Sequence, residues 1–420
     1  MTTIALYADW LPGQAPSHFA NLDCYQAGGA ETFALTLSQD FQAHPDLLKL
    51  SLDPDIAWQP GPQYPRAPRS IFGLLQDSSP DRWGRMLMNR RLERDKRAGR
   101  AEKDQRLGES DYLLGVHDAF RVGALRLRLN DEGPFLDDRQ GRAAPPMASL
   151  SALETAARAI ESGDDSPAVD EWLRLLVAPG GSLGGARPKA SVAGENGSLW
   201  IAKFPSAKDT HDLGAWELLT QVLAKACNIR VPPAQARKFA SSHHTFIVAR
   251  FDRPTPATRQ HFASAMTLTG NVDGNDASSG VSYLDIAEVL IDYGANTTED
   301  LRELWRRIVF NLCVSNTDDH LRNHGFLLEP GKGWRLSPAY DMNPSRDAAG
   351  LKLNITQHDN AMNLDLAREV AEVFRYGAME AEQEIARIQQ MVRQWSTLAG
   401  KLGIPAKEQA MFSGCFALAG

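Results

Sequence analysis

The chain has 420 residues, and its 43% apolar and 23% charged content is typical of a globular protein with room for two or three domains. The net charge of −7 and the pI near 5.8 argue against nucleic-acid binding through bulk charge, although a local basic patch stays possible. The four widely spaced cysteines form no Cys-x-x-Cys pair, which predicts a reducing cytoplasm and no structural zinc. We expect no signal peptide, and no apolar run approaches the ~20 residues that span a bilayer.

The first third of the chain predicts short strands followed by helices. Residues 3–10 and 32–37 alternate as strands do. Residues 71–99 are helical in pattern but are interrupted at Ser79-Pro80-Asp81, a typical helix start. The segment 129–148, rich in Gly, Pro and charge, predicts a linker between lobes or a long hairpin. Helices are expected at 149–162 and 168–177.

A glycine-rich loop follows at residues 178–192. Four glycines and Ser182 within six residues let backbone N–H groups approach an anion closely. The loop is not a Walker A motif, because Ala186-Arg187 stands where Lys-Ser/Thr should follow. A plain hairpin turn is the alternative. Lys189 either reaches a phosphate or is an ordinary surface lysine.

Two strands and a helix come next. Residues 198–204 predict a strand with Lys203 near its end, and the following helix, 213–226, carries Glu217 in its first half. In kinases, a Lys on such a strand pairs with the nucleotide phosphates and is held by a Glu of the next helix. An acidic residue near a helix start is also ordinary dipole chemistry. The strand at 245–251 lies where an adenine-binding hinge would be, and 267–282 predicts a loop.

The most informative stretch is the polar loop 315–324, between a predicted helix at 299–314 and a strand at 325–328. Asp318 and Asn323 have the spacing of a kinase catalytic loop, in which the Asp orients the attacking hydroxyl and the Asn holds Mg²⁺. Asp341, after a hairpin turn at 329–333, supplies a second oxygen ligand for a metal that prefers few carboxylates. The alternative is that Asp318 and Asp319 cap turns and His320 packs in a core. Helices are expected at 364–374 and 378–402.

Taken together, five motifs resemble the HipA family of serine/threonine kinases, the toxins of bacterial toxin–antitoxin modules. The motifs are GGSLGGARPKAS, IAKFP, ARFDR, NTDDHLRNHGF and LSPAYDMNPS. The resemblance covers nearly the whole chain and implies an α+β, two-lobed, protein-kinase-like fold with a β-rich N-terminal lobe and a mainly helical C-terminal lobe. It implies an N-terminal subdomain at 1–105, the rest of the N-lobe with the Gly-rich loop and hinge at 106–255, and the helical kinase lobe at 256–420.

The resemblance also implies a role for individual residues. Asp318 is the catalytic Asp, and His320 belongs to the same loop signature. Asn323 and Asp341 are the Mg²⁺ ligands. The ATP-contacting residues are Lys203, Phe251, Gly181, Ser182, Gly184, Gly185 and Lys189, with Ser182 matching an autophosphorylated serine. This chain departs from the family at Ala249, where some relatives carry an acidic hinge residue, and at Asp319, which would compete for metal or cap a turn.

The implied function is transfer of the ATP γ-phosphoryl to a protein Ser or Thr, with an aminoacyl-tRNA synthetase as the implied substrate. The implied partner is a HipB-like helix-turn-helix antitoxin, so operator DNA would be contacted only through the antitoxin. We expect a cytoplasmic protein without membrane contact. Two alternatives stay open: a small-molecule phosphotransferase on the same fold, and a catalytically silent co-repressor that acts with an antitoxin.

Overall fold

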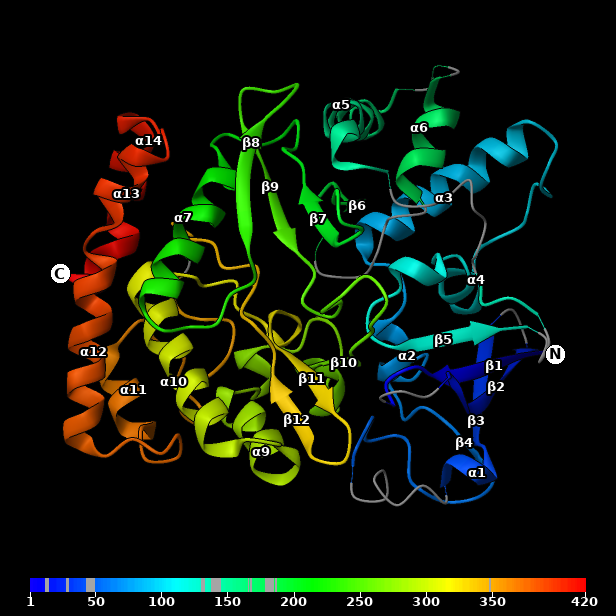
Figure 1. Cartoon of the computed structure of the whole chain (residues 1–420), viewed down its shortest axis with the longest axis horizontal. Helices are drawn as coiled ribbons and strands as arrows, with labels where there is room; N and C mark the ends of the chain where they lie inside the picture. Colours follow the sequence, from blue (N-terminus) through cyan, green and yellow to red (C-terminus); the bar gives the residue numbers. More distant parts are fainter. Residues whose placement is uncertain are drawn as a thin grey trace. The chain divides into compact units, whose positions relative to one another are not determined.

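The computed structural model describes residues 1–11, 15–27, 30–42, 50–129, 133–136, 145–164, 166, 168–177, 185, 187–346 and 349–420. Figure 1 labels the helices and strands of the chain. The chain divides into two compact units. Unit 1 comprises Met1–Lys208, Phe239–Ser242 and Ile247–Ala263, and unit 2 comprises Asp209–Lys238, His243–Phe246 and Ser264–Gly420. The three expected domains at 1–105, 106–255 and 256–420 stay a prediction. Within the described ranges, no helix combines the length and the apolar character that crossing a membrane requires.

Unit 1 begins with a five-stranded antiparallel sheet in the order β4-β3-β2-β1-β5. Its strands are β1 (Thr2–Ala8), β2 (Ser17–Ala27), β3 (Ala30–Leu37), β4 (Pro62–Gln63) and β5 (Leu125–Arg128), with the short helix α1 (Gln39–Gln42) after β3. Strand β1 lies between β2 and β5, since its Leu6 pairs with Ala20 of β2 and with Leu127 of β5. The expected strands at 3–10 and 32–37 are confirmed as β1 and β3.

The remaining helices of unit 1 mostly have the predicted positions, although the one at Glu109–Leu114 was not predicted. They are α2 (Gly73–Asp77), α3 (Arg82–Arg97), α4 (Glu109–Leu114), α5 (Leu150–Glu161) and α6 (Ala168–Val177). The predicted interruption is confirmed: the Asp81 carboxylate caps α3 by accepting the Gly84 N–H at 2.8 Å. A core of buried aliphatic residues includes Leu153 of α5, Leu173 of α6 and Leu87 of α3. This core holds the two helices that precede the glycine-rich loop.

A second sheet has the order β6-β7-β9-β8. Its strands are β6 (Lys189–Ala193), β7 (Leu199–Lys203), β8 (Ala234–Lys238) and β9 (His244–Ala249). Strands β6 and β7 pair antiparallel, with Lys189 opposite Lys203. Residues 247–249 of β9 belong to unit 1 and residues 244–246 to unit 2. The prediction that Lys203 lies near a strand end is confirmed, since it is the last residue of β7.

Unit 2 is mainly helical and contains one hairpin. Its helices are α7 (Leu213–Ala226), α8 (Ala265–Leu268), α9 (Tyr283–Tyr293), α10 (Thr297–Val314), α11 (Leu364–Val370), α12 (Ala378–Val392), α13 (Trp395–Lys401) and α14 (Ala406–Phe412). Strands β11 (Gly325–Glu329) and β12 (Gly333–Leu336) form the hairpin. Strand β10 (Phe262–Ser264), the neighbour of β11, has only Ser264 in unit 2. Helix α10 carries the apolar face that the sequence predicted, with Leu304, Ile308 and Leu312 all fully buried. The predicted turn at 329–333 is confirmed.

One prediction in unit 2 is wrong. Residues 378–402 were expected to form one helix, but the chain turns between α12 and α13. The amphipathic period does not reveal this break, because both helices present the same kind of apolar face. At the break, Arg393 Nε donates to the Ala419 carbonyl at 2.6 Å, and Gln389 Nε2 donates to the Leu418 carbonyl at 2.7 Å. The turn is therefore stabilised by residues near the C-terminus of the chain.

Candidate functional site

The polar loop after α10 begins with a backbone conformation that is rare for a residue with a side chain. Ser315, the C-cap of α10, has a φ of 51° in the left-handed region. Thr317 and Asp318 form a turn, and a 3-10 turn at Leu321–Asn323 leads into β11. The Asp318 side chain is exposed at the tip of this loop, and its carboxylate makes no hydrogen bond with the described residues. It is therefore accessible to a substrate.

Asp319, the next residue, faces the opposite way into the protein. Its Oδ2 accepts hydrogen bonds from Tyr283 Oη at 2.6 Å, Asn311 Nδ2 at 2.7 Å and His324 Nε2 at 2.8 Å. Burial alone would raise the pKa of Asp319, but the His324 imidazole and the Tyr283 hydroxyl outweigh it and hold the pKa below its usual value. Because Asp319 Oδ2 already accepts from three side-chain donors, this oxygen neither caps a turn nor is open to a metal. Asp319 anchors the loop to α9 and α10.

Asn323 has the features of a ligand for a hard cation. Its side chain is 4% exposed, and its Nδ2 donates to the Asp318 carbonyl at 3.1 Å. Its Oδ1 is buried and accepts no hydrogen bond from the described residues. A buried carbonyl oxygen without a donor is unfavourable unless another group fills the position. Mg²⁺ takes amide and carboxylate oxygens, so this oxygen fits the predicted metal.

Asp341, the other predicted metal ligand, lies in an unusual backbone conformation. Its φ is 58°, and such strain in a residue with a Cβ atom clusters at functional sites. The described residues contain no group of three His, Cys, Asp or Glu side chains able to hold a metal ion. A cation bound here would therefore take few protein oxygens and fill the rest of its shell from phosphates and water.

The loop that carries Asp341 is tied on both sides to the rest of unit 2. Before it, the Tyr340 hydroxyl donates to the Arg322 carbonyl at 2.8 Å. After it, Thr220 Oγ1 of α7 donates to the Met342 carbonyl at 2.6 Å, and the Asn343 N–H donates to Asn316 Oδ1 at 3.2 Å. The loops of Asp318 and Asp341 are thus joined within one unit.

Sequence reasoning missed the buried polar residues that join these loops, Tyr283, Asn311, Asn316 and His324. One signal was available. Asn311 lies on the apolar face of α10 between Ile308 and Leu312, and it is 2% exposed. A polar residue inside such a face needs a hydrogen-bonding partner, which marks it for attention.

His320 was expected either to support catalysis or to pack in a core. The side chain is partly buried, and its Nδ1 is buried without a hydrogen bond to the described residues. Its backbone N–H donates to the Asp318 carbonyl at 3.0 Å, and its carbonyl accepts the Asn323 N–H at 2.8 Å. Its role in catalysis stays a prediction, and its backbone links the two predicted site residues.

The predicted nucleotide-binding residues are spread over both units. Half-exposed Lys203 ends β7 in unit 1, and Phe251, also in unit 1, packs its ring against Phe262 with centroids 6.1 Å apart. Glu217 lies on α7 in unit 2 and is 7% exposed. Gly181, Ser182 and Gly184 lie outside the described residues. Their binding roles stay predictions.

Lys189 is not the surface lysine of the alternative interpretation, because only 2% of it is exposed. Its Nζ pairs with Asp81 Oδ2 at 2.6 Å and donates to the Gly185 carbonyl at 3.1 Å. Gly185 has a φ of 79°, a conformation that favours glycine. The indole N–H of Trp83 also donates to the Lys189 carbonyl, at 3.1 Å. The end of the glycine-rich loop is therefore joined to the start of α3.

Asp81→Ser tests this junction. A serine can still cap α3, but it leaves the Lys189 ammonium without its carboxylate. We expect the free energy of unfolding to fall by about 2 kcal/mol, the usual contribution of a hydrogen bond to a charged group. Chemical denaturation followed by circular dichroism measures it. The control is Glu93→Gln, which removes an exposed partner of Lys96 on the same helix and should change nothing. Equal stability of Asp81→Ser and wild type would contradict a stabilising role of the pair.

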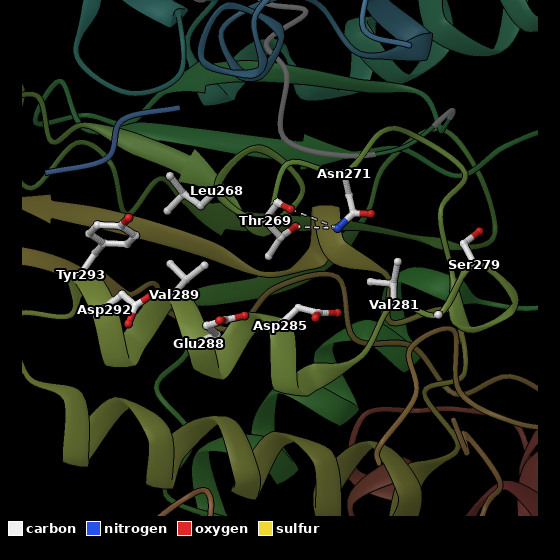
Figure 2. Close-up of a pocket in the computed structure, with 11 residues that line it drawn as sticks. Leu268, Thr269, Asn271, Ser279, Val281, Asp285, Glu288, Val289, Asp292 and Tyr293 are labelled. Carbon is white, nitrogen blue, oxygen red and sulfur yellow. Dashed lines mark hydrogen bonds between the residues drawn. The ribbon is translucent and has the colours of Figure 1, made fainter. Parts of the chain in front are cut away.

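A pocket of about 350 Å³ lies in unit 2, between α9 and the segment that follows α8 (Figure 2). Asp285, Glu288 and Asp292 follow one another along the α9 side, and Thr269 and Asn271 face them. Three carboxylates repel a polyphosphate, so this pocket does not suit a nucleotide. None of the predicted site residues lines it.

Comparisons with known proteins identify a matching family and a matching fold. The model of the family described as HipA-like C-terminal domain matches residues 181–395, just over half of the 420 residues. A solved structure from Shewanella oneidensis MR-1, a toxin–antitoxin complex of HipA, HipB and operator DNA, superposes with a TM-score of 0.67 at 17% identity. The superposition covers 99% of this chain and 95% of that chain. This match confirms the predicted α+β, HipA-like fold.

Two relatives carry kinase names. A Haemophilus influenzae protein named "Putative kinase" is 29% identical over 146 residues, which cover 33% of this chain and 43% of that protein. A Sinorhizobium fredii protein named "Putative kinase Y4dM" is 27% identical over 274 residues, which cover 53% of this chain and 65% of that protein. The chain thus matches less than two thirds of the length of either relative.

Proposed function

The chain belongs to the family with the HipA-like C-terminal domain, and on that premise we propose that it is an ATP-dependent kinase that phosphorylates serine or threonine in a protein. The proposal depends on the arrangement of two neighbouring side chains, Asp318 and Asn323. The exposed Asp318 carboxylate stands beside Asn323, whose buried amide oxygen has no donor among the described residues. A proton acceptor open to a substrate and an oxygen suited to a cation are the parts that phosphoryl transfer needs.

In this proposal, the Asp318 carboxylate orients the attacking hydroxyl and accepts its proton. Asn323 and Asp341 would hold Mg²⁺, which neutralises charge on the nucleotide phosphates when it is bound. Lys203 and the glycine-rich loop with Gly185 would contribute positive charge and N–H donors to the nucleotide phosphates. Glu217 would be the acidic residue of the nucleotide site, and Phe251 would contact adenine. Most phosphoryl-transfer catalysis consists of such positioning and electrostatic stabilisation.

The partners are part of the same proposal. The Shewanella protein forms a complex with HipB and its operator DNA, and we assign this chain a helix-turn-helix antitoxin of the same kind. With a net charge of −7, DNA contact through the antitoxin is the more favourable arrangement. We propose an aminoacyl-tRNA synthetase as the protein substrate. A small-molecule phosphotransferase and a silent co-repressor are the competing functions.

Intact-mass spectrometry after incubation with Mg·ATP tests autophosphorylation at Ser182. We expect one phosphate on wild type, after prior phosphatase treatment, and none on Ser182→Ala. A phosphate adds a charge of about −2 beside the loop proposed to hold nucleotide phosphates, so it should also weaken ATP binding. Ser242→Ala, at an exposed serine of unit 1, serves as the control and should gain the phosphate as wild type does.

The outcomes separate the candidate functions. A phosphate on Ser182→Ala would place the modification elsewhere. The absence of ATP binding and of any mass change would favour the co-repressor. Transfer to small alcohols or aminoglycosides, with none to protein, would favour the small-molecule enzyme.

A further inference from the structure

A chain of buried hydrogen bonds runs from Asp319 to the loop that carries Asp341. Asp319 Oδ2 accepts from Asn311 Nδ2 at 2.7 Å, and Asn311 Oδ1 accepts from Asn316 Nδ2 at 3.0 Å. Asn316 Oδ1 then accepts the backbone N–H of Asn343 at 3.2 Å. Asn311, Asn316 and Asp319 are 2%, 1% and 3% exposed, respectively. Water therefore cannot readily replace the two links among these three side chains, while the link to the Asn343 N–H is partly buried.

Each link also fixes the orientation of the next one. A carboxamide has one donor end and one acceptor end, and Asn311 and Asn316 both use both ends. A flip of either amide would place two donors or two acceptors against each other. Polar networks that are satisfied in this way are rigid, because each bond holds the groups of its neighbours.

The two ends of this series of hydrogen bonds, Asp319 and Asn343, lie in the two segments that would hold a cation. Asp319 is four residues before Asn323 in the loop after α10, and Asn343 is two residues after Asp341. Other bonds join the same segments, since the Ser345 N–H donates to the Ser315 carbonyl at 2.9 Å. We call the hydrogen bonds that run through Asn311 and Asn316 the carboxamide chain. Both side chains are buried, and each can be replaced by mutation without the other.

We propose that Asn311 and Asn316 are positioning residues for the divalent-cation site. They hold the loop of Asp341 against the loop of Asn323, so that the cation meets a preformed arrangement of protein oxygens. Neither residue is placed at the cation itself. The inference rests on the proposed kinase function and adds to it two residues that act through others. Residues that support metal ligands in this way change affinity about 10–100-fold when they are replaced.

The test uses the full chain and Mn²⁺ in place of Mg²⁺, with binding followed by electron paramagnetic resonance in the presence of ATP. We expect Asn316→Ala to lower the Mn²⁺ affinity about 10–100-fold, while ATP affinity without divalent cation stays as in wild type. Asn311→Ala breaks the same chain at another link and should have the same effect, so either variant suffices if the other does not fold.

Trp305→Phe is the matched control. Trp305 is buried on the same helix α10, and its indole donates to the Ala367 carbonyl at 2.8 Å, away from the carboxamide chain. Its replacement should lower the melting temperature without changing the Mn²⁺ affinity. If Trp305→Phe loses as much affinity as Asn316→Ala, general destabilisation explains the loss and the inference is overturned.

The remaining outcomes separate the inference from the function on which it rests. If wild type binds Mn²⁺ with ATP, and both folded asparagine variants bind it equally well, the positioning role is refuted and the kinase proposal stands. If wild type itself binds no Mn²⁺ in the presence of ATP, the proposed cation site fails, and the kinase proposal fails with it.

Discussion

Asp318→Asn is expected to slow phosphoryl transfer about 10²–10⁴-fold, the range for loss of a general acid–base group. Asparagine has nearly the same size but cannot accept the proton of the attacking hydroxyl. Because the Asp318 side chain is exposed and has no hydrogen bond with the described residues, stability and ATP affinity should stay as in wild type. Single-turnover consumption of radiolabelled ATP measures the rate, its dependence on enzyme concentration measures the ATP affinity, and thermal denaturation measures the stability.

Asp292→Asn is the matched control for this result. Asp292 is an exposed aspartate of the same unit, on α9, away from the loop of Asp318. The same change in charge there should alter neither the rate nor the melting temperature. A rate for Asp318→Asn within about tenfold of wild type would lie below the range for such groups and would remove Asp318 from its proposed role.

The second large effect is expected at Asp252, in unit 1. Its carboxylate is fully buried and accepts hydrogen bonds from Arg250 Nη2 at 2.6 Å, Arg253 Nη1 at 2.8 Å and the Gly123 N–H at 2.9 Å. Asp252→Ala leaves two buried guanidinium groups without this carboxylate. We expect a loss of about 3–5 kcal/mol in the free energy of unfolding, a large share of the ~5–15 kcal/mol that stabilises a typical protein. Urea denaturation followed by circular dichroism measures it.

Asp9→Asn provides a comparison within the same unit. Asp9 is partly exposed and lies 3.4 Å and 3.5 Å from the nearest guanidinium nitrogens of Arg126 and Arg259. Its loss should cost about 0–1 kcal/mol, as for a loose surface pair. If Asp252→Ala is no less stable than Asp9→Asn, the buried arginine cluster does not depend on its carboxylate.

The contribution of Asp252 to the free energy of unfolding should also depend on pH. Burial alone would raise its pKa, but the charges of Arg250 and Arg253 outweigh burial and hold the pKa far below the usual value. A group with a depressed pKa in the folded state contributes stability that is fully present above its unfolded pKa, about 3.9, and is lost as the pH falls towards the folded value. The difference in stability between wild type and Asp252→Asn should therefore stay constant from neutral pH to about pH 4 and shrink below it.

Features that depend on short stretches of chain were predictable from the sequence. The helix 213–226, the strand that ends at Lys203 and the hairpin turn at 329–333 all have the expected positions. Their signals are local: apolar periodicity, a capping residue and turn residues act over a few positions. The break between α12 and α13 was missed because its partners, Leu418 and Ala419, lie 29 and 26 residues from Gln389 and Arg393.

The sequence by itself determined the family, the α+β class and the spacing of Asp318, Asn323 and Asp341, because motif and period are read along the chain. Only the tertiary structure decided that Asp318 faces outward and Asp319 inward. These adjacent aspartates have opposite environments because Tyr283 and Asn311 donate hydrogen bonds to Asp319 and not to Asp318. Tyr283 is 36 residues away from Asp319 in the sequence. The apolar periodicity of the sequence does not predict such contacts, because they depend on how the helices pack against the loop. The loops of Asn323 and Asp341 are joined by the same kind of long-range contact.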